Sequence, residues 1–425
     1  MTTTDPRTRR VLRPNLRSDA AVDLARWPEM APPEPAPFRG AIARKVMRRV
    51  AKRAGLRVEL PDGSFFGPAD APVIRILQPE NYFTRLGRDG KIGFGESFMA
   101  GEWDAPDVAA VIARLARQVG TLVPQRLQWI RSFYDAHHPA AEDNDRKGAR
   151  KNISRHYDLS NDLFALFLDE TMTYSSALFD DPAAEDLTTA QHRKIDRLLD
   201  QTGVTEGTRL LEIGTGWGEL AIRAARRGAK VTTITLSVEQ ASLAVDRARE
   251  AGVIDNIEVK LCDYRDVEGT YDAIVSVEMI EAVGEKWWPT YFETLDARLA
   301  PGGRIGIQAI VMPHDRMLAS RRSWTWIHKY IFPGGLLPSV RAIDEIVNSK
   351  TSLRISDNTA FGLSYAETLE RWRETFLAHT DDVDGMGFDE TFRRMWTFYL
   401  AYCEGGFAAG YLDVVQLTFT REARR

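Results

Sequence analysis

Short apolar segments alternate with amphipathic helical segments in the C-terminal part of the chain, from about Asn152 onward. Runs of this length, rich in Val, Ile and Leu, indicate buried strands. The predicted strands cover residues 209–213, 230–236, 256–261, 273–277, 304–311 and 414–420. Strands that alternate with helices are typical of a mainly parallel sheet covered by helices on both faces. We therefore predict an α/β domain over residues 152–425.

The N-terminal part of the chain follows a different pattern. Residues 1–38 are rich in proline and arginine, which predicts a flexible or extended tail. Residues 39–134 mix short apolar strands with helical stretches, including a predicted helix over 106–119, and indicate a small α+β domain. The polar segment 135–151 is predicted to be a linker, and a chain of 425 residues is long enough for two or three domains.

The segment 40–58 is a basic, amphipathic helix in this interpretation. Its charged residues are all basic: Arg44, Lys45, Arg48, Arg49, Lys52, Arg53 and Arg57. Apolar residues recur at every fourth position and form one stripe: Ile42, Val46, Val50 and Ala54. The helix either packs on a core with its basic face in solvent or rests on anionic lipid headgroups. Nucleic acid is disfavoured as a partner because no nucleic-acid-binding module accompanies the helix.

Composition narrows the class of protein further. The net charge is −4 and 44% of the residues are hydrophobic, which permits a normal globular core. Cys262 and Cys403 are far apart and suit neither a disulfide framework nor a zinc site, so we predict no metal and a reducing, cytoplasmic location. No segment is predicted to span a bilayer and no signal peptide is recognised. Any membrane contact is therefore expected to be peripheral.

A glycine-rich loop follows the first strand of the α/β domain. Its glycines are at alternate positions: Gly214, Gly216 and Gly218. They permit a sharp turn and close approach of a ligand to the N-terminus of the next helix. A dinucleotide fingerprint requires glycine at position 219, where Glu219 stands, and this disfavours NAD and FAD. Glu212, just before the loop, suits the methionyl amine of S-adenosylmethionine. The alternative is a tight turn without a ligand.

Polar residues also follow the next two predicted strands. Thr235, Leu236 and Gln240 come at the end of the second strand, and Asp263 and Tyr264 at the end of the third. Ligands of doubly wound sheets lie at the carboxyl ends of the strands. Asp263 is predicted to accept a hydrogen bond from adenine, and Tyr264 to cover its ring; a helix cap is the alternative for Asp263. Because no acid closes the second strand, Thr235 and Gln240 are expected to bind the ribose.

Several segments together resemble the cyclopropane-fatty-acyl-phospholipid synthases and the related mycolic-acid methyltransferases. The matching segments are 156–162, 173–175, 211–218, 235–240, 263–266, 331–339 and 416–420, with a weaker match at 95–104. The resemblance covers about residues 152–420. It implies a Rossmann-like S-adenosylmethionine-dependent methyltransferase, with Tyr174 and Ser175 beside the cofactor. The family adds the sulfonium methyl carbon across a cis double bond of a lipid acyl chain, so the site must also hold a base.

The base of this family is a bicarbonate ion, held by a cysteine, a glutamate, a histidine, a tyrosine and a backbone amide. The resemblance places three of these ligands at Glu281, Tyr365 and the amide of Ile310. The other positions depart from the family: Ser176 replaces the cysteine, and Ala282 and Gln308 replace histidines. These departures weaken the case for bicarbonate and for a cyclopropane product.

A second carboxylate, Glu278, lies close to Glu281 in the sequence. If this stretch forms the turn after the fourth strand, both carboxylates can face one site. Paired acids near an apolar pocket raise the pKa of one of them, which suits a general base. The alternative is that Glu278 is solvated or bonds to the cofactor.

The combined prediction is the transfer of a one-carbon unit to the cis double bond of an unsaturated phospholipid acyl chain, giving a methylene- or methyl-branched chain. The enzyme is expected at the cytoplasmic face of the membrane, as a homo-oligomer by resemblance. A saturated branch needs a separate reductase, because no flavin or nicotinamide site is recognised. The close alternative is a cyclopropane product. A methyltransferase for a soluble molecule is disfavoured by the basic helix, and a non-catalytic lipid carrier by the glycine loop.

Overall fold

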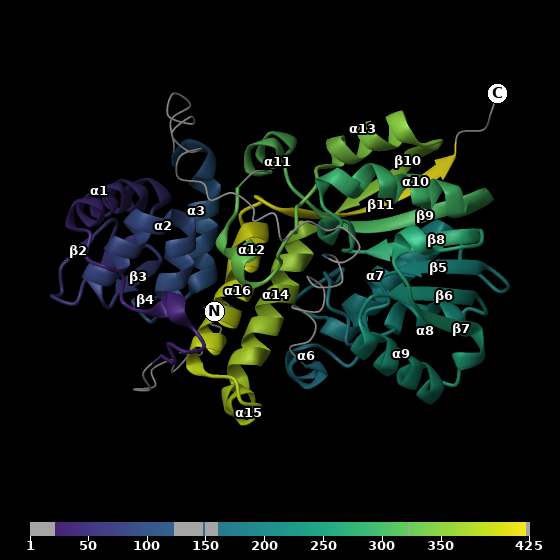
Figure 1. Cartoon of the computed structure of the whole chain (residues 1–425), viewed down its shortest axis with the longest axis horizontal. Helices are drawn as coiled ribbons and strands as arrows, with labels where there is room; N and C mark the ends of the chain where they lie inside the picture. The colour runs from purple at the N-terminus through teal and green to yellow at the C-terminus, as the bar shows by residue number, and fades with distance from the viewer. Residues whose placement is uncertain (1–21, 123–147, 149–159, 322, 422–425) are drawn as a thin grey trace, which may run out of the picture. The chain divides into compact units, whose positions relative to one another are not determined.

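The computed structural model describes residues 22–122, 148, 160–321 and 323–421 (Figure 1). The chain divides into two compact units. Unit 1 consists of residues 1–130 and 376–405, and unit 2 of residues 131–375 and 406–425. The expected linker 135–151 lies outside the described residues except for Gly148. Within the part of the chain that the structure describes, no helix combines the length and the apolar composition that crossing a bilayer requires.

Unit 1 packs helices around a small four-stranded sheet. The strands, in their order across the sheet, are β2 (Phe65–Phe66), β1 (Arg57–Glu59), β3 (Val73–Ile76) and β4 (Trp103–Asp104). The helices are α1 (Pro37–Ala54), α2 (Pro79–Met99), α3 (Val108–Leu122), α15 (Thr380–Gly385) and most of α16 (Glu390–Ala408). The segment 95–104 has a structural role here, because Glu102 forms a 2.8 Å ion pair with the fully buried Arg85.

Two segments of unit 1 differ from the sequence-based division. Residues 22–36 wrap along the unit: Met30 is buried, and the Trp27 indole donates to Asp389 at 2.8 Å. Residues 376–405, which we expected in the methyltransferase domain, belong to unit 1 because Arg394 donates to the carbonyl oxygens of Phe98 and Trp103. The other domain boundaries stay predictions.

Most of the predicted apolar stripe of α1 is not buried in unit 1, and of its four residues only Ala54 is buried. The buried residues of the helix are Ala43, Met47, Ala51 and Ala54. Ile42 and Val46 are instead each 49% exposed, and Phe38 at the start of the helix is 78% exposed. The packing face consists of alanine and methionine, and the sulfur of Met47 lies 3.9 Å from the Tyr82 hydroxyl of α2. The exposed part of the predicted stripe fits the alternative in which it contacts lipid.

Unit 2 contains the predicted α/β sheet. Its seven strands, in spatial order, are β10 (Leu353–Ala360), β11 (Asp413–Arg421), β9 (Leu299–Val311), β8 (Tyr271–Val277), β5 (Arg209–Ile213), β6 (Lys230–Thr235) and β7 (Ile257–Leu261). The strands from β9 to β7 are parallel, and β11 is antiparallel to both of its neighbours. The fold class and every predicted strand are confirmed. Sequence reasoning missed β10, a strand of mostly polar residues.

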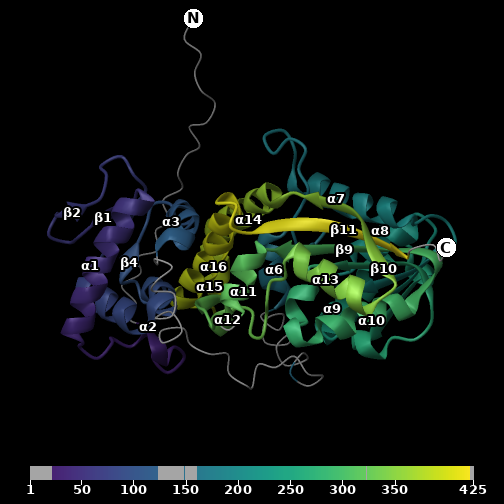
Figure 2. The ribbon, with the colours of Figure 1, turned by 90° about the horizontal axis from the view of Figure 1, so that it is seen from above.

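Helices cover both faces of this sheet (Figure 2). Helices α7 (Leu187–Thr202) and α8 (Glu219–Arg226) pack on one face, and α10 (Trp288–Arg298) and α13 (Val340–Lys350) on the other. Helix α9 (Val238–Glu250) contacts β6 and β7, and the short helix α6 (Asn161–Phe167) precedes α7. Because five neighbouring strands are parallel, their carboxyl ends meet at one edge of the sheet and place their following loops together.

Candidate functional site

A cleft lies at the carboxyl ends of the parallel strands of unit 2. Its empty volume is about 1090 Å³, part of which is open to solvent. The predicted cofactor-binding residues that line it are Tyr174, Ser175, Glu212, Gly214, Gly216, Thr235, Leu236, Gln240 and Tyr264. Two predicted residues, Gly218 and Asp263, are not part of the lining. Pockets of this size hold ligands as large as a nucleoside with an amino-acid side chain.

The glycine loop needs glycine for two different reasons. Gly216 has φ 51° and open space where a side chain would project, so it gives the ligand room and adopts a conformation that disfavours other residues. Gly218 has φ 93°, and a Cβ there would lie 3.1 Å from Cβ of Ala244 in α9. Gly218 is therefore required for packing between the loop and α9, and this explains its absence from the lining.

Glu212 provides a test of whether the cleft fits a cation. Its side chain is only 4% exposed, and its Oε2 has no hydrogen-bond partner among the described residues. Burial raises the pKa of Glu212 to about 8. A buried carboxylate oxygen without a partner is costly unless a ligand supplies one. An ammonium group at this point would satisfy the oxygen, so the site fits the amino group of S-adenosylmethionine.

The predicted cofactor-binding residues at the ends of β6 and β7 differ in their contacts. The Thr235 hydroxyl donates to Oε1 of Gln240 at 2.8 Å, and both residues line the cleft. Asp263 accepts from the backbone nitrogen of Arg265 at 2.9 Å and forms a 2.7 Å ion pair with the same residue. Asp263 thus caps the 3₁₀ helix Tyr264–Asp266 and is not among the residues that line the cleft. Its contact with adenine stays a prediction. Tyr264 does line the cleft.

Helix α7 carries two site residues that sequence reasoning missed. Gln191 donates to the carbonyl oxygens of Thr173 and Ser175 at 3.2 and 2.9 Å. Lys194 donates to Oγ of Ser175 at 2.7 Å, and burial lowers the pKa of this lysine to about 8. The signal was a lysine on the apolar face of an amphipathic helix, where a charged residue is rarely buried without a functional or structural reason.

Glu278 is the centre of a buried hydrogen-bond network. Its Oε1 accepts from the backbone nitrogen of Ser176 at 2.9 Å and from the side chain of Gln308 at 2.8 Å. Its Oε2 accepts from the Tyr365 hydroxyl at 2.7 Å. Glu278 also has φ 50°, a left-handed backbone conformation that a non-glycine residue adopts only when its surroundings enforce it. Burial raises the pKa of Glu278, and Lys194 opposes this effect.

Glu281 follows in the 3₁₀ helix Ile280–Ala282. Its Oε1 accepts from the backbone amide of Ile310, and its Oε2 has no hydrogen-bond partner among the described residues. Burial, and secondly the negative charge of Glu278, raise the pKa of Glu281 to about 8. The segment 331–339 supports this position, because Leu336 donates from its backbone nitrogen to the Glu281 carbonyl oxygen at 2.9 Å. Glu281 is thus a carboxyl group with one free acceptor and a pKa near neutrality.

The residues that replace the cysteine and the second histidine of the family are engaged within the protein. Gln308 donates to Glu278 and to the Ser176 carbonyl oxygen at 2.8 and 3.3 Å, and accepts from Gln416 at 3.1 Å. The Ser176 hydroxyl donates to the Ala177 carbonyl oxygen at 2.9 Å. Ser176, Gln308, Tyr365 and Glu281 do not line the cleft, whereas Glu278 and Ala282 do.

The described residues include no group of three or more His, Cys, Asp or Glu side chains placed to hold a metal ion.

Comparisons with known proteins agree with this geometry. Residues 144–417 match the profile of the family described as mycolic acid cyclopropane synthetase. The chain is 53% identical over 414 residues to the tuberculostearic acid methyltransferase UfaA1 of Mycobacterium tuberculosis, covering 95% of this chain and 97% of that relative. It is 34% identical over 383 residues to the cyclopropane-fatty-acyl-phospholipid synthase of Escherichia coli strain K12, covering 89% and 93%.

A solved structure with a bound ligand resembles this chain over part of its length. The mycolic acid cyclopropane synthase CmaA1 complexed with SAH and CTAB has a TM-score of 0.59 and 29% identity, and it covers 64% of this chain and 97% of that chain. Its bound SAH, together with the carboxylate oxygen of Glu212 that lacks a partner, supports S-adenosylmethionine as the ligand of the cleft.

Proposed function

Because this chain belongs to the mycolic acid cyclopropane synthetase family, we propose that it adds a one-carbon unit to the cis double bond of an unsaturated phospholipid acyl chain, giving a methylene- or methyl-branched product. The chain is an S-adenosylmethionine-dependent enzyme of fatty-acyl chains. When bound, this cofactor supplies an electrophilic methyl group. The relative that shares 53% identity is a tuberculostearic acid methyltransferase, and its name supports the branched product.

The observation that carries the proposal is the free acceptor of Glu281. Methylation of an alkene leaves a positive charge on carbon, and the reaction ends when a base removes a proton. Glu281 offers Oε2 as the acceptor, and burial holds the pKa of its carboxyl group at about 8. Tyr365 and Gln308 bind Glu278 from two sides and fix the second carboxylate in place. We assign the role of the base to Glu281. The charge and hydrogen bonds around its carboxyl group are set by the neighbouring network of Glu278, Tyr365, Gln308 and Ser176.

The same network supports a branched product over a ring. Gln308 and Ser176 stand where the resemblance expects bicarbonate ligands, yet their side chains bond to Glu278 and to backbone oxygens. With bicarbonate disfavoured, we expect a carboxyl group of the chain to remove the proton. A saturated methyl branch then requires a separate reductase as a partner.

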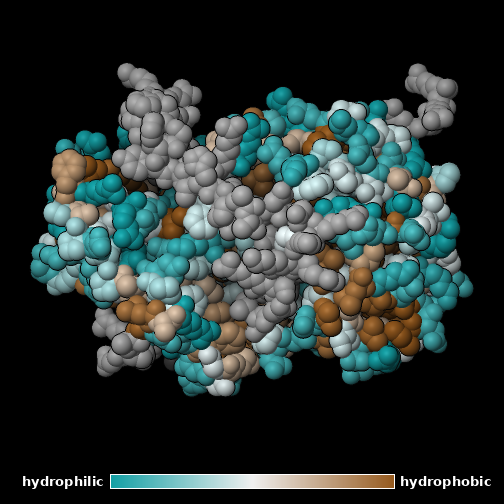
Figure 3. Space-filling view, viewed as in Figure 1, coloured by the Kyte–Doolittle hydropathy of each residue, from teal (hydrophilic) through white to brown (hydrophobic). Residues whose placement is uncertain are grey.

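The exposed residues of helix α1 in unit 1 support binding of the protein to the membrane surface. Phe38, Ile42 and Val46 form an exposed apolar stripe on α1, flanked by exposed basic residues such as Arg49 and Lys52. Figure 3 shows hydrophobic and hydrophilic residues side by side in the region of α1. A helix of this kind suits peripheral binding to anionic lipid at the cytoplasmic face of the membrane. Assembly into a homo-oligomer is a further expectation from the family resemblance.

Lipid analysis of cells that express the chain tests the reaction. Membrane lipids should gain acyl chains that are heavier than their unsaturated precursors by one CH₂ unit, or by CH₂ and two hydrogens where a reductase has saturated the branch. Cells that express Glu281→Gln should gain neither. Ozonolysis separates the products, because it cleaves an exocyclic methylene group and leaves a cyclopropane ring intact. Acyl chains that are heavier by CH₂ alone and that resist ozone would indicate the cyclopropane alternative and not the branched product. Modification of soluble molecules alone would overturn the proposal.

A further inference from the structure

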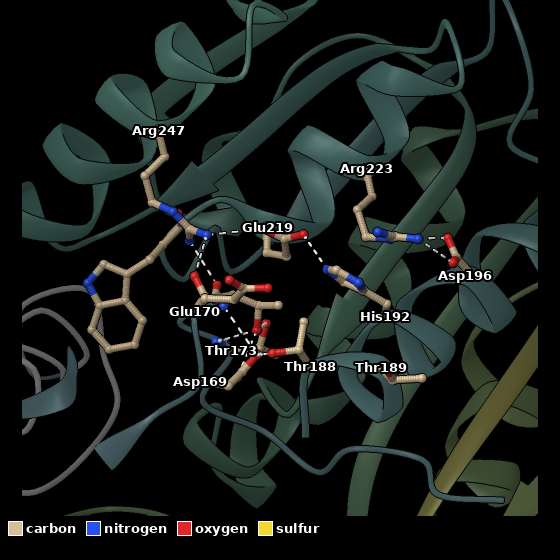
Figure 4. Close-up of polar contacts among 12 residues, drawn as sticks. Asp169, Glu170, Thr173, Thr188, Thr189, His192, Asp196, Glu219, Arg223 and Arg247 are labelled. Atoms are coloured by element: carbon tan, nitrogen blue, oxygen red, sulfur yellow. Dashed lines mark hydrogen bonds and ion pairs between the residues drawn. The ribbon is translucent and has the colours of Figure 1, made fainter. Parts of the chain in front are cut away.

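Glu219 joins two helices at the rim of the cofactor cleft. It is the first residue of α8 and occupies the position where a dinucleotide-binding loop has glycine. Its Oε2 lies 3.1 Å from a guanidinium nitrogen of Arg247 in α9, and its Oε1 lies 3.0 Å from Nε2 of His192 in α7. Figure 4 shows Glu219 between these two partners. The proposed one-carbon transfer uses none of these groups, so their arrangement needs another explanation.

Arg247 connects the two walls of the cleft. One guanidinium nitrogen donates to the Thr171 carbonyl oxygen at 2.8 Å and to the Trp217 carbonyl oxygen at 2.9 Å. The other donates to the Glu170 carbonyl oxygen at 3.2 Å as well as to Glu219. Trp217 belongs to the glycine loop. Residues 169–173, of which Thr171, Met172 and Thr173 line the cleft, form a second segment of its wall. A planar guanidinium can satisfy several acceptors at once in this fixed geometry, whereas lysine cannot.

The wall formed by residues 169–173 has a defined shape of its own. Asp169 accepts from the Thr171 backbone nitrogen and hydroxyl at 3.2 and 2.9 Å, and from the Thr188 hydroxyl at 2.9 Å. Met172 has φ 54° and lines the cleft beside Thr171 and Thr173. Such a backbone conformation persists only where surrounding contacts enforce it. One end of the wall is held to α7 by Gln191, and Arg247 holds the other end.

We propose that Arg247, oriented by Glu219, clamps residues 169–173 against the glycine loop and thereby sets the rate at which the cofactor and its demethylated product leave the cleft. Arg247 is a positioning residue in this role. Opening of the wall has to break its bonds to Glu170 and Thr171, and these bonds are charge-assisted. The inference concerns cofactor exchange only, so its test does not depend on the proposed acyl-chain chemistry.

The dissociation rate of S-adenosylhomocysteine from purified protein tests the clamp. Arg247→Met should release this ligand about tenfold faster, with a smaller change in the association rate. Amide hydrogen exchange should rise at residues 169–173 and stay unchanged in the strands of the sheet. Glu219→Gln keeps the backbone contacts of Arg247 and should have a smaller effect of the same sign. Arg249→Met, on the same helix, removes only an exposed ion pair with Asp246 and should behave like the parent.

Two results would overturn the clamp. One is a parent-like dissociation rate in folded Arg247→Met protein. The other is faster exchange throughout unit 2 with no excess at residues 169–173, which would assign Arg247 to general stability. If Arg247→Met does not fold, Arg247→Lys replaces it, because lysine keeps the charge but cannot reach all the acceptors. Faster release is expected there too, and a parent-like rate in that variant would likewise reject the proposal.

Discussion

Gln308 donates from its side-chain amide to Oε1 of Glu278 at 2.8 Å. The second amide contact goes to the Ser176 carbonyl oxygen, and the amide oxygen accepts from Gln416. A histidine at this position, as the family resemblance expects, could bind an external anion. Gln308 instead donates to a carboxylate of the protein itself. In the proposed mechanism a carboxyl group of the chain, that of Glu281, takes the place of bicarbonate as the base.

The first prediction concerns bicarbonate. In carbonate-depleted buffer, turnover should be nearly insensitive to added bicarbonate, because the polar groups of Gln308 and Ser176 are already engaged. The measurement is the initial rate of methyl transfer from radiolabelled cofactor to lipid across a bicarbonate titration. An enzyme of the same family with the histidine and cysteine in place serves as the positive control. Strong activation of this chain would restore the bicarbonate mechanism.

The second prediction concerns the glycine loop. Gly216→Val should abolish binding of S-adenosylmethionine in isothermal titration, because a branched side chain disfavours φ 51° and projects into the cleft. Gly252→Val is the matched control: Gly252 has φ 69° with open space around its Cβ position, but it does not line the cleft. Its variant carries similar backbone strain and should bind the cofactor normally. Equal affinities for both variants would remove Gly216 from the site.

Much of this site was predictable from sequence because local patterns determine it. The strand Arg209–Ile213 and the loop after it depend on apolar runs and on glycine, both of which are visible in the chain. Lys194 and Gln191 were missed because their partners, Ser175 and Thr173, become neighbours only when α7 packs across the sheet.

Two other sequence-based expectations show the limits of local patterns. Periodicity predicted the apolar stripe of α1 but could not decide whether this stripe packs or is exposed, because an adjacent alanine-rich face packs in its place. For Asp263, the sequence permitted both a ligand contact and a helix cap. The structure shows the cap and an ion pair with Arg265, while the ligand contact stays a prediction.

The third prediction concerns the membrane. Replacing Arg48, Arg49, Lys52 and Arg53 with glutamine should weaken binding to vesicles that contain anionic lipid, by about 1 kcal/mol per residue at most. The effect should be largest at low salt, because ions screen exposed charges. Co-sedimentation with vesicles measures it, and a variant with Arg249 and Arg341 changed to glutamine, both exposed in unit 2, is the control.

The apolar stripe of α1 gives an independent test of the same surface. Phe38→Ser with Ile42→Ser should weaken vesicle binding at high salt as well, because apolar burial does not depend on ionic strength. Equal sedimentation of the parent and both sets of variants would assign α1 to packing within the protein.

The fourth prediction concerns the base. Glu281→Gln should abolish turnover while S-adenosylmethionine still binds, because Glu212 and the glycine loop remain. A base acts in its deprotonated form, and the pKa of Glu281 is raised to about 8 by burial and by Glu278. Turnover of the parent should therefore increase with pH through about 8 and then level off. Glu278→Gln removes the neighbouring negative charge, so the pKa of Glu281 should fall and the rise in turnover should move to lower pH.

Glu278→Gln should also lower the maximal rate, because a carboxylate with a lower pKa is a weaker base and Tyr365 loses a charged acceptor. The measurement is the pH profile of turnover at saturating cofactor, with cofactor affinity determined at each pH. Glu285→Gln, a nearby exposed acid paired with Arg321, should keep the parent profile. The carboxylate pair is rejected if Glu278→Gln retains both the rate and the profile of the parent, because Glu278 would then contribute neither to the raised pKa of Glu281 nor to proton removal.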